Sequence, residues 1–241
     1  MILREAMEIM INEILSILGD HNPSIYLYGS VATGDFKLGW SDIDILVLTD
    51  REITEQQAEG LVHLRQRLQE RYPENPYFRL FEGGMLSLDA FLEKKKERTV
   101  YWGTRGQRIV DSYIFNSLST ADLLDYGVVL YGSDIRPKMT YPSYEQMRED
   151  IRLHVQAARK YGEEVGWLLD IARGIYTLRT GKIISKTKAG EWALEQSLCP
   201  DKDMLQKALQ IRKKPFRYSK EDRSIDNRVI QRFADVLEGY F

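Results

Sequence analysis

Two short motifs near the N-terminus carry residue types that chemistry on a phosphate requires. Gly29 and Ser30 end an apolar segment, and eleven residues separate Ser30 from the Asp42-Ile-Asp44 motif. In a strand, residues i and i+2 point to the same face, so Asp42 and Asp44 would project together. Their mutual repulsion would be relieved by a divalent cation such as Mg²⁺. Gly29 would let a phosphate approach the backbone closely, and Ser30 offers it a hydroxyl and an N–H.

A further acidic residue, Glu82, follows an apolar segment later in the chain. Phe78, Leu80 and Glu82 alternate, which predicts one face of a strand with the acid on the side that is otherwise apolar. A carboxylate on a buried face needs a reason, since acids are rarely buried unpaired. Glu82 is therefore a candidate site residue, although an acid at a strand end before a Gly-Gly bulge remains an alternative. Asp89 and Glu93 are weaker rivals because their segment is typical of a solvated helix.

The elements that would position these residues follow from apolar periodicity and turn signals. Strands are expected at 24–28 and 42–48, and the pattern at 99–118 fits either a strand or a helix. Helices are expected at 3–18, 54–72, 121–131, 147–158, 165–176, from 185 or 187 to 193, 201–211 and 222–238. The prediction is an α/β (α+β) domain with a mixed sheet over 1–140, followed after a linker near 136–144 by an all-α helical bundle over 141–241.

The composition is that of an ordinary globular protein and excludes some classes of function. The 241 residues carry a net charge of −2, which provides no overall positive field to attract nucleic acid. One cysteine allows no intramolecular disulfide, which fits a reducing cytoplasm. The N-terminus lacks the pattern of a signal peptide, and no apolar stretch is long enough to span a membrane. The three histidines show no zinc-type spacing.

The Gly-Ser turn followed by two aspartates resembles the nucleotidyltransferase superfamily of the DNA polymerase β type. The resemblance implies that Gly29 and Ser30 hold the triphosphate of a nucleotide. It also implies that Asp42, Asp44 and a third carboxylate on a neighbouring strand bind two Mg²⁺ ions. Glu82 is our candidate for that third carboxylate, and it would also act as the general base for the acceptor hydroxyl.

The segment 171–196 resembles the C-terminal helical domain of the bacterial adenylyltransferases that modify streptomycin and spectinomycin. The matching positions are Ala172, Arg173, Thr177, Thr180, Gly181, Ser185, Lys186 and Trp192. By this resemblance ATP is the nucleotide, and Arg173 and Lys186 bind its phosphates. Lys186 stands at the start of an expected helix, where the helix dipole disfavours a cation, so an anion docking at that terminus would explain it.

Three positions depart from the family's pattern. Family members that accept streptomycin have a Trp and an Asp at positions that, by count, fall near Arg105 and Arg159, and a base-stacking tyrosine of the family falls near Arg212. Two arginines would repel cationic streptomycin, which favours spectinomycin as the acceptor. Glu163 and Glu164 would still attract a cationic antibiotic.

The sequence thus predicts a cytoplasmic, Mg²⁺-dependent enzyme that transfers AMP from ATP to a hydroxyl of an aminocyclitol or aminoglycoside antibiotic. A transferase of the same chemistry acting on a protein, an RNA end or another small molecule is the alternative. A nucleotide-binding module without catalysis is a third hypothesis. No membrane partner is expected, and nucleic acid is not the favoured one.

Overall fold

The computed structural model describes residues 2–103 and 106–241, so Arg105 lies outside the described residues. The chain forms two compact units, each with its own core. The first comprises Met1–Ala32, Asp42–Phe115 and Tyr126–Thr140, and the second comprises Thr33–Ser41, Asn116–Asp125 and Tyr141–Phe241. Two segments from within the first 140 residues therefore belong to the second unit.

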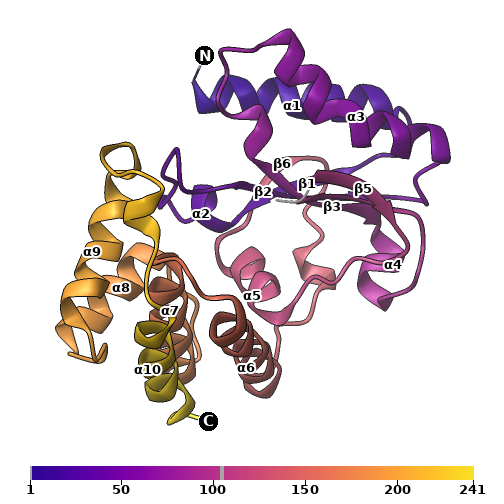
Figure 1. Ribbon diagram of the computed structural model, residues 1–241. Coiled ribbons are helices and arrows are strands. Elements are labelled where there is room, and N and C mark those ends of the chain that lie inside the picture. The colour runs from indigo at the N-terminus through magenta and orange to yellow at the C-terminus, as the bar shows by residue number, and fades with distance from the viewer. Residues whose placement is uncertain (1, 104–105) are drawn as a thin grey trace. The chain divides into compact units, whose positions relative to one another are not determined.

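A sheet forms the centre of the first unit (Figure 1). In the described residues its strands are β1 (Ser24–Tyr28), β2 (Ile43–Thr49), β3 (Phe81–Ser87), β4 (Thr99–Gly103), β5 (Gly106–Val110) and β6 (Val128–Tyr131). The strand order is β5-β4-β3-β2-β1-β6. Only β2 and β3 pair in parallel among these neighbours, and the other pairs are antiparallel, so the sheet is mixed.

Helices α1 (Leu3–Leu18) and α3 (Glu55–Arg71) lie on one face of this sheet, and α4 (Leu88–Glu93) lies on the other. The apolar stripe predicted for the first helix is buried, with Met10 and Ile14 fully enclosed. Thr54 and Gln57 form the expected capping box, because each side chain bonds the other's backbone N–H. The sequence therefore predicted these elements and their buried faces well.

Two predictions within the first 140 residues are wrong. Phe78–Leu80 is a 3-10 turn rather than part of a strand, and β3 begins only at Phe81. The turn allows Phe78 to be completely buried, with its ring centroid 5.5 Å from that of Tyr72. The helix expected over 121–131 ends earlier: α5 spans Ser117–Tyr126, and the next residues form β6, whose backbone pairs with β1.

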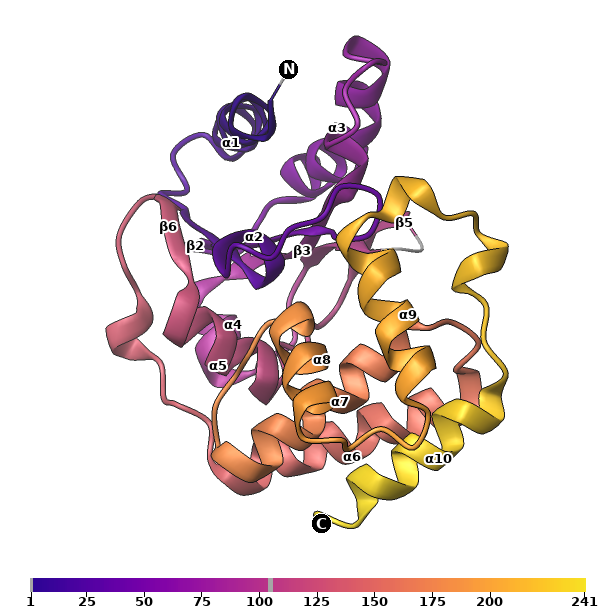
Figure 2. The ribbon, with the colours of Figure 1, turned by 90° about the vertical axis from the view of Figure 1, so that its left-hand side faces the viewer.

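The second unit is mainly helical (Figure 2). Its helices include α6 (Tyr144–Tyr161), α7 (Gly166–Thr180), α8 (Lys186–Glu195), α9 (Lys202–Lys213) and α10 (Asn227–Glu238). Ser185, rather than Thr187, caps α8, because its hydroxyl accepts from the backbone of Lys188. Leu168, Ile175 and Phe233 belong to the buried apolar cluster that joins these helices. Within the described parts of the chain, we find no helix with the length and apolarity to cross a membrane.

Candidate functional site

The structure brings the Gly-Ser turn directly against the aspartate strand. Gly29 begins the short helix α2 (Gly29–Ala32) and has φ +68°, a conformation that favours glycine. A Cβ placed on Gly29 would lie 2.1 Å from Oδ2 of Asp44, so the missing side chain is what lets this carboxylate approach. The Ser30 hydroxyl donates to the backbone carbonyl of Asp42 at 3.2 Å. The two motifs of the sequence therefore form a single local structure.

The sheet register places Glu82 beside Asp44. Tyr28 pairs with Asp44 across β1 and β2, and Asp44 pairs with Glu82 across the parallel strands β2 and β3. Residues paired across neighbouring strands project to the same face of a sheet. Glu82 is thus next to the aspartate motif, whereas its rivals Asp89 and Glu93 lie on α4.

These acids suit Mg²⁺ but do not form a complete cage for it. In residues 2–103 and 106–241, no group of three or more His, Cys, Asp or Glu side chains is arranged to hold a metal ion. Asp44 and Glu82 supply adjacent carboxylate oxygens, and Asp42 lies two residues before Asp44. Mg²⁺ commonly binds one or two carboxylates together with phosphate oxygens of a substrate. The donor set therefore fits an ion that binds jointly with a nucleotide.

A buried cation, Arg65, lies close to the acidic residues. Its side chain extends from α3 and donates to the backbone carbonyl of Phe81 at 2.7 Å, one residue before Glu82. Burial lowers the pKa of Arg65, while the negative charges of Glu82 and Asp42 act to raise it. Arg65 thus partly offsets the acidic charge, a role that nothing in its local sequence indicated.

Tyr113 covers the sheet next to the carboxylates. Gly84, two residues after Glu82, leaves room for it, since a Cβ there would lie 2.4 Å from the tyrosine ring. Burial raises the pKa of Tyr113 to about 12, a hydrogen bond with Tyr28 lowers it, and Asp44 and Glu82 are among the charges that raise it. Tyr113 thus places an aromatic ring near Asp44 and Glu82, which are themselves only partly buried.

In the second unit, the two cations predicted to bind phosphate meet at one carboxylate. Asp170, on α7, receives a hydrogen bond from Arg173 at 3.1 Å on Oδ1 and from Lys186 at 3.0 Å on Oδ2. His154 of α6 lies 3.8 Å from the same Oδ2, and the Asp170 side chain is only 11% exposed. Burial acts to raise the pKa of Asp170, but Lys186, His154 and Arg173 together hold it well below its usual range.

A second carboxylate, Asp35, occupies the start of α8. It accepts from the backbone N–H of Thr187 at 3.1 Å and from the Thr187 hydroxyl at 2.6 Å. Arg212 donates to Asp35 at 2.7 Å, and both side chains of this ion pair are more than nine-tenths buried. The expected anion at this helix terminus is therefore a side chain of the protein itself, and Lys186 pairs with a different carboxylate.

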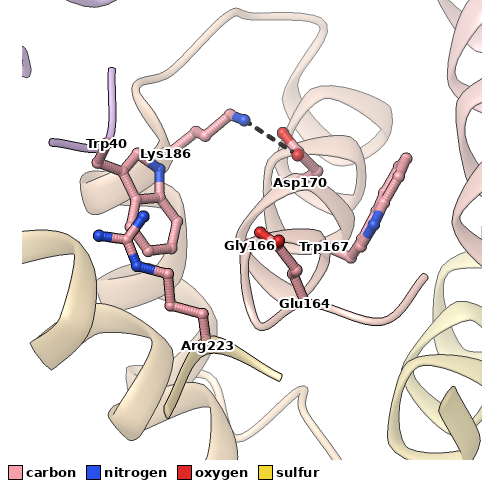
Figure 3. A pocket seen from close by; sticks show the side chains of 7 residues that line it. All are labelled: Trp40, Glu164, Gly166, Trp167, Asp170, Lys186 and Arg223. Atoms are coloured by element: carbon pink, nitrogen blue, oxygen red, sulfur yellow. Dashed lines mark hydrogen bonds and ion pairs between the residues drawn. The ribbon is translucent and has the colours of Figure 1, made fainter. Parts of the chain in front are cut away.

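A pocket of about 220 Å³ opens beside Asp170 (Figure 3). Its lining is Trp40, Glu164, Gly166, Trp167, Asp170, Lys186 and Arg223. Backbone hydrogen bonds hold the segment of Glu164, with the Val165 N–H donating to the Arg223 carbonyl at 2.8 Å. Gly166 leaves space for the Trp40 indole, which a Cβ would approach to 3.3 Å. The pocket combines two aromatic walls with two acids and two cations, so it can accept amines and phosphates.

Of the two arginines in the charge argument against streptomycin, the structure describes only Arg159. Arg159 donates to Asp235 at 2.6 Å and forms an ion pair with Glu238 at 2.9 Å, so its charge is compensated, and it does not line the pocket. Arg212 has the structural role described above. Arg105 lies outside the described residues. Of the two acids proposed to attract a cationic acceptor, Glu164 lines the pocket, whereas Glu163 does not.

Comparison with known proteins agrees with both halves of the sequence prediction. Residues 9–98 match the nucleotidyltransferase domain family, and residues 142–238 match the aminoglycoside adenylyltransferase C-terminal domain family. No curated protein matches the chain closely enough to be counted as a relative. The two matches nevertheless cover most of the chain, in the order that the sequence predicted.

A solved structure has a similar fold. It is the spectinomycin adenyltransferase AAD(9) from Enterococcus faecialis, determined with ATP and spectinomycin. The TM-score is 0.69 at 18% identity, and the likeness covers 96% of this chain and 99% of that one. The predicted fold class, a domain with a mixed sheet followed by a helical region, is confirmed.

Proposed function

We propose that this chain, which belongs to an aminoglycoside adenylyltransferase-like family, transfers AMP from ATP to a hydroxyl of an aminocyclitol antibiotic. The observation that carries this proposal is the close approach of the Gly29 backbone to the Asp44 side chain. Asp44 is in turn paired with Glu82 on the neighbouring strand. A phosphate-binding turn and paired carboxylates are what nucleotidyl transfer requires. The reaction would take place in the cytoplasm, where ATP is available.

The reaction assigns one role to each group. Gly29 and Ser30 bind phosphate, and Asp42, Asp44 and Glu82 would hold two Mg²⁺ ions, which compensate the negative charge of the phosphates when bound. Glu82 also accepts the proton of the acceptor hydroxyl. The hydroxyl oxygen forms a bond to the α-phosphorus, the bond from that phosphorus to the bridging oxygen breaks, and pyrophosphate leaves. Arg173 and Lys186 supply positive charge for the phosphates.

Spectinomycin is the proposed acceptor, ahead of streptomycin. The support is the likeness in fold to a protein named for spectinomycin, together with the Glu164 carboxylate, which lines the pocket along with Trp40 and Trp167. Protonated amines pair favourably with a carboxylate and with aromatic faces. A pocket of about 220 Å³ holds only part of a drug-sized ligand, which favours a compact acceptor.

The test is pyrophosphate release with ATP, Mg²⁺ and a panel of aminocyclitols and aminoglycosides, with the adenylylated product identified by mass. We expect turnover with spectinomycin and none with streptomycin. Equal turnover of both drugs would refute the specificity, and no turnover with any drug would refute the antibiotic acceptor.

Two variants connect the reaction to the site. Asp44→Asn is expected to abolish the release while the protein stays folded. Asp50→Asn makes the same charge change just after β2, where Asp50 accepts from Asn22, and should leave the rate unchanged. Wild-type activity of Asp44→Asn would show that the metal site is misplaced.

A further inference from the structure

Arg173 and Lys186 are already occupied by an anion of the protein. Both cations contact Asp170, one on each carboxylate oxygen, at 3.1 and 3.0 Å. Phosphate oxygens accept the same kind of charge-assisted hydrogen bond from guanidinium and ammonium groups. The Asp170 carboxylate therefore uses the donors that a bound phosphate would use.

We infer that Asp170 is an internal competitor for phosphate at Arg173 and Lys186, and that it weakens the binding of nucleotide. This inference rests on the proposed function, which assigns these two cations to ATP. Their side chains remain about one-third exposed, at 35% and 31%, so a ligand from solvent can reach them. The Asp170 side chain is 11% exposed and is also approached by His154. The carboxylate thus stays near the cations, and an incoming phosphate must share or displace it.

The negative charge of Asp170 explains why this residue should weaken phosphate binding. With Asp170 ionised, Arg173 and Lys186 present one net positive charge to a phosphate instead of two. The Asp170 carboxylate also repels a phosphate bound to the same two cations. Its removal should therefore strengthen nucleotide binding, whereas a carboxylate that only oriented the two cations would weaken binding when removed.

The test compares Asp170→Asn with the wild type by calorimetric titration. The probes are the Mg²⁺ complex of a non-hydrolysable ATP analogue and inorganic tripolyphosphate. We expect both to bind Asp170→Asn about tenfold more tightly, a change of about 1.4 kcal/mol. In a Lys186→Ala background the gain should shrink, because one of the two released donors is gone.

Asp235→Asn is the matched control. It removes one carboxylate at 2.6 Å from Arg159 in the same unit, outside the pocket lining, and should leave both affinities unchanged. Equal or weaker binding of the ATP analogue by Asp170→Asn would overturn the inference while the proposed function stands. If neither protein binds the ATP analogue, tighter tripolyphosphate binding by Asp170→Asn would support the competition for phosphate at Arg173 and Lys186 and would refute the proposed function. If Asp170→Asn does not fold, Asp170→Ser provides the same comparison.

Discussion

Replacement of Gly29 by alanine should disable the site by moving one carboxylate. A Cβ at this position would lie 2.1 Å from Oδ2 of Asp44. Carbon and oxygen atoms in contact are normally about 3.3 Å apart or more, so the carboxylate must move by about 1 Å or more. A misplacement of about 1 Å near a reacting centre can cost about a hundredfold in rate. We therefore expect Gly29→Ala to reduce pyrophosphate release about a hundredfold with the acceptor that the panel identifies.

The control for this prediction is Gly181→Ala. Gly181 also has φ +68°, but a Cβ there would meet no atom within 4 Å. Both variants place alanine in a left-handed conformation, which costs about 1–2 kcal/mol. The melting temperature of each should fall by about 2–8 °C, judged from the size of the chain. Only Gly29→Ala should lose activity, and a Gly29→Ala enzyme within about threefold of the Gly181→Ala rate would refute the reasoning.

Two further predictions concern buried polar groups. Asp35→Asn should destabilise the protein by about 3 kcal/mol at neutral pH, because it leaves the buried Arg212 without its carboxylate. Burial raises the pKa of Asp35, but its bonds to Thr187 and Arg212 lower it overall, so the stability it contributes is present above its unfolded pKa of about 3.9. That contribution is lost as the pH falls through the folded pKa of Asp35. Denaturant titrations of the wild type and of Asp35→Asn, from pH 7 downward, should show the difference in their free energies of unfolding shrinking only below about pH 4. A difference that stays constant over this range would contradict the prediction. Burial raises the pKa of Tyr113 to about 12. The ultraviolet spectrum of the wild type minus that of Tyr113→Phe should therefore show at most about a tenth of this residue as tyrosinate up to about pH 11; a midpoint near 10 would show that the ring is accessible to water.

The sequence predicted the elements that carry strong local signals. The glycine-serine turn, the aspartate strand and the long helices follow from local periodicity and capping residues, as at Thr54 and Ser185. Glu82 was chosen partly from an alternation that the structure does not contain, because Phe78–Leu80 is a 3-10 turn. Its position beside Asp44 depends on the register of β2 and β3, which only the folded sheet defines.

Long-range pairing explains most of what the sequence did not reveal. β6 has a short Val-Val-Leu-Tyr sequence that continues the pattern of the preceding helix, and its pairing with β1 decides that it is a strand. The ion pair of Asp35 and Arg212 joins residues far apart in the chain, so no local pattern indicates it. The contact of Asp170 with Arg173 was also not predicted, although a spacing of three residues on one helix brings two side chains close enough to interact.

The path of the chain through the two units has a consequence for how the gene can be cut and recombined. The segment Thr33–Ser41, encoded between the two motifs of the first unit, belongs to the second unit, where Asp35 pairs with Arg212 and Trp40 lines the pocket. A gene fragment starting at residue 141 would therefore encode the helices without this segment. The guanidinium of Arg212 would lose its carboxylate, and the pocket would lose one aromatic wall. Exchange of the C-terminal region between homologous genes would have to carry codons 33–41 with it, because the second unit is not one continuous block of coding sequence.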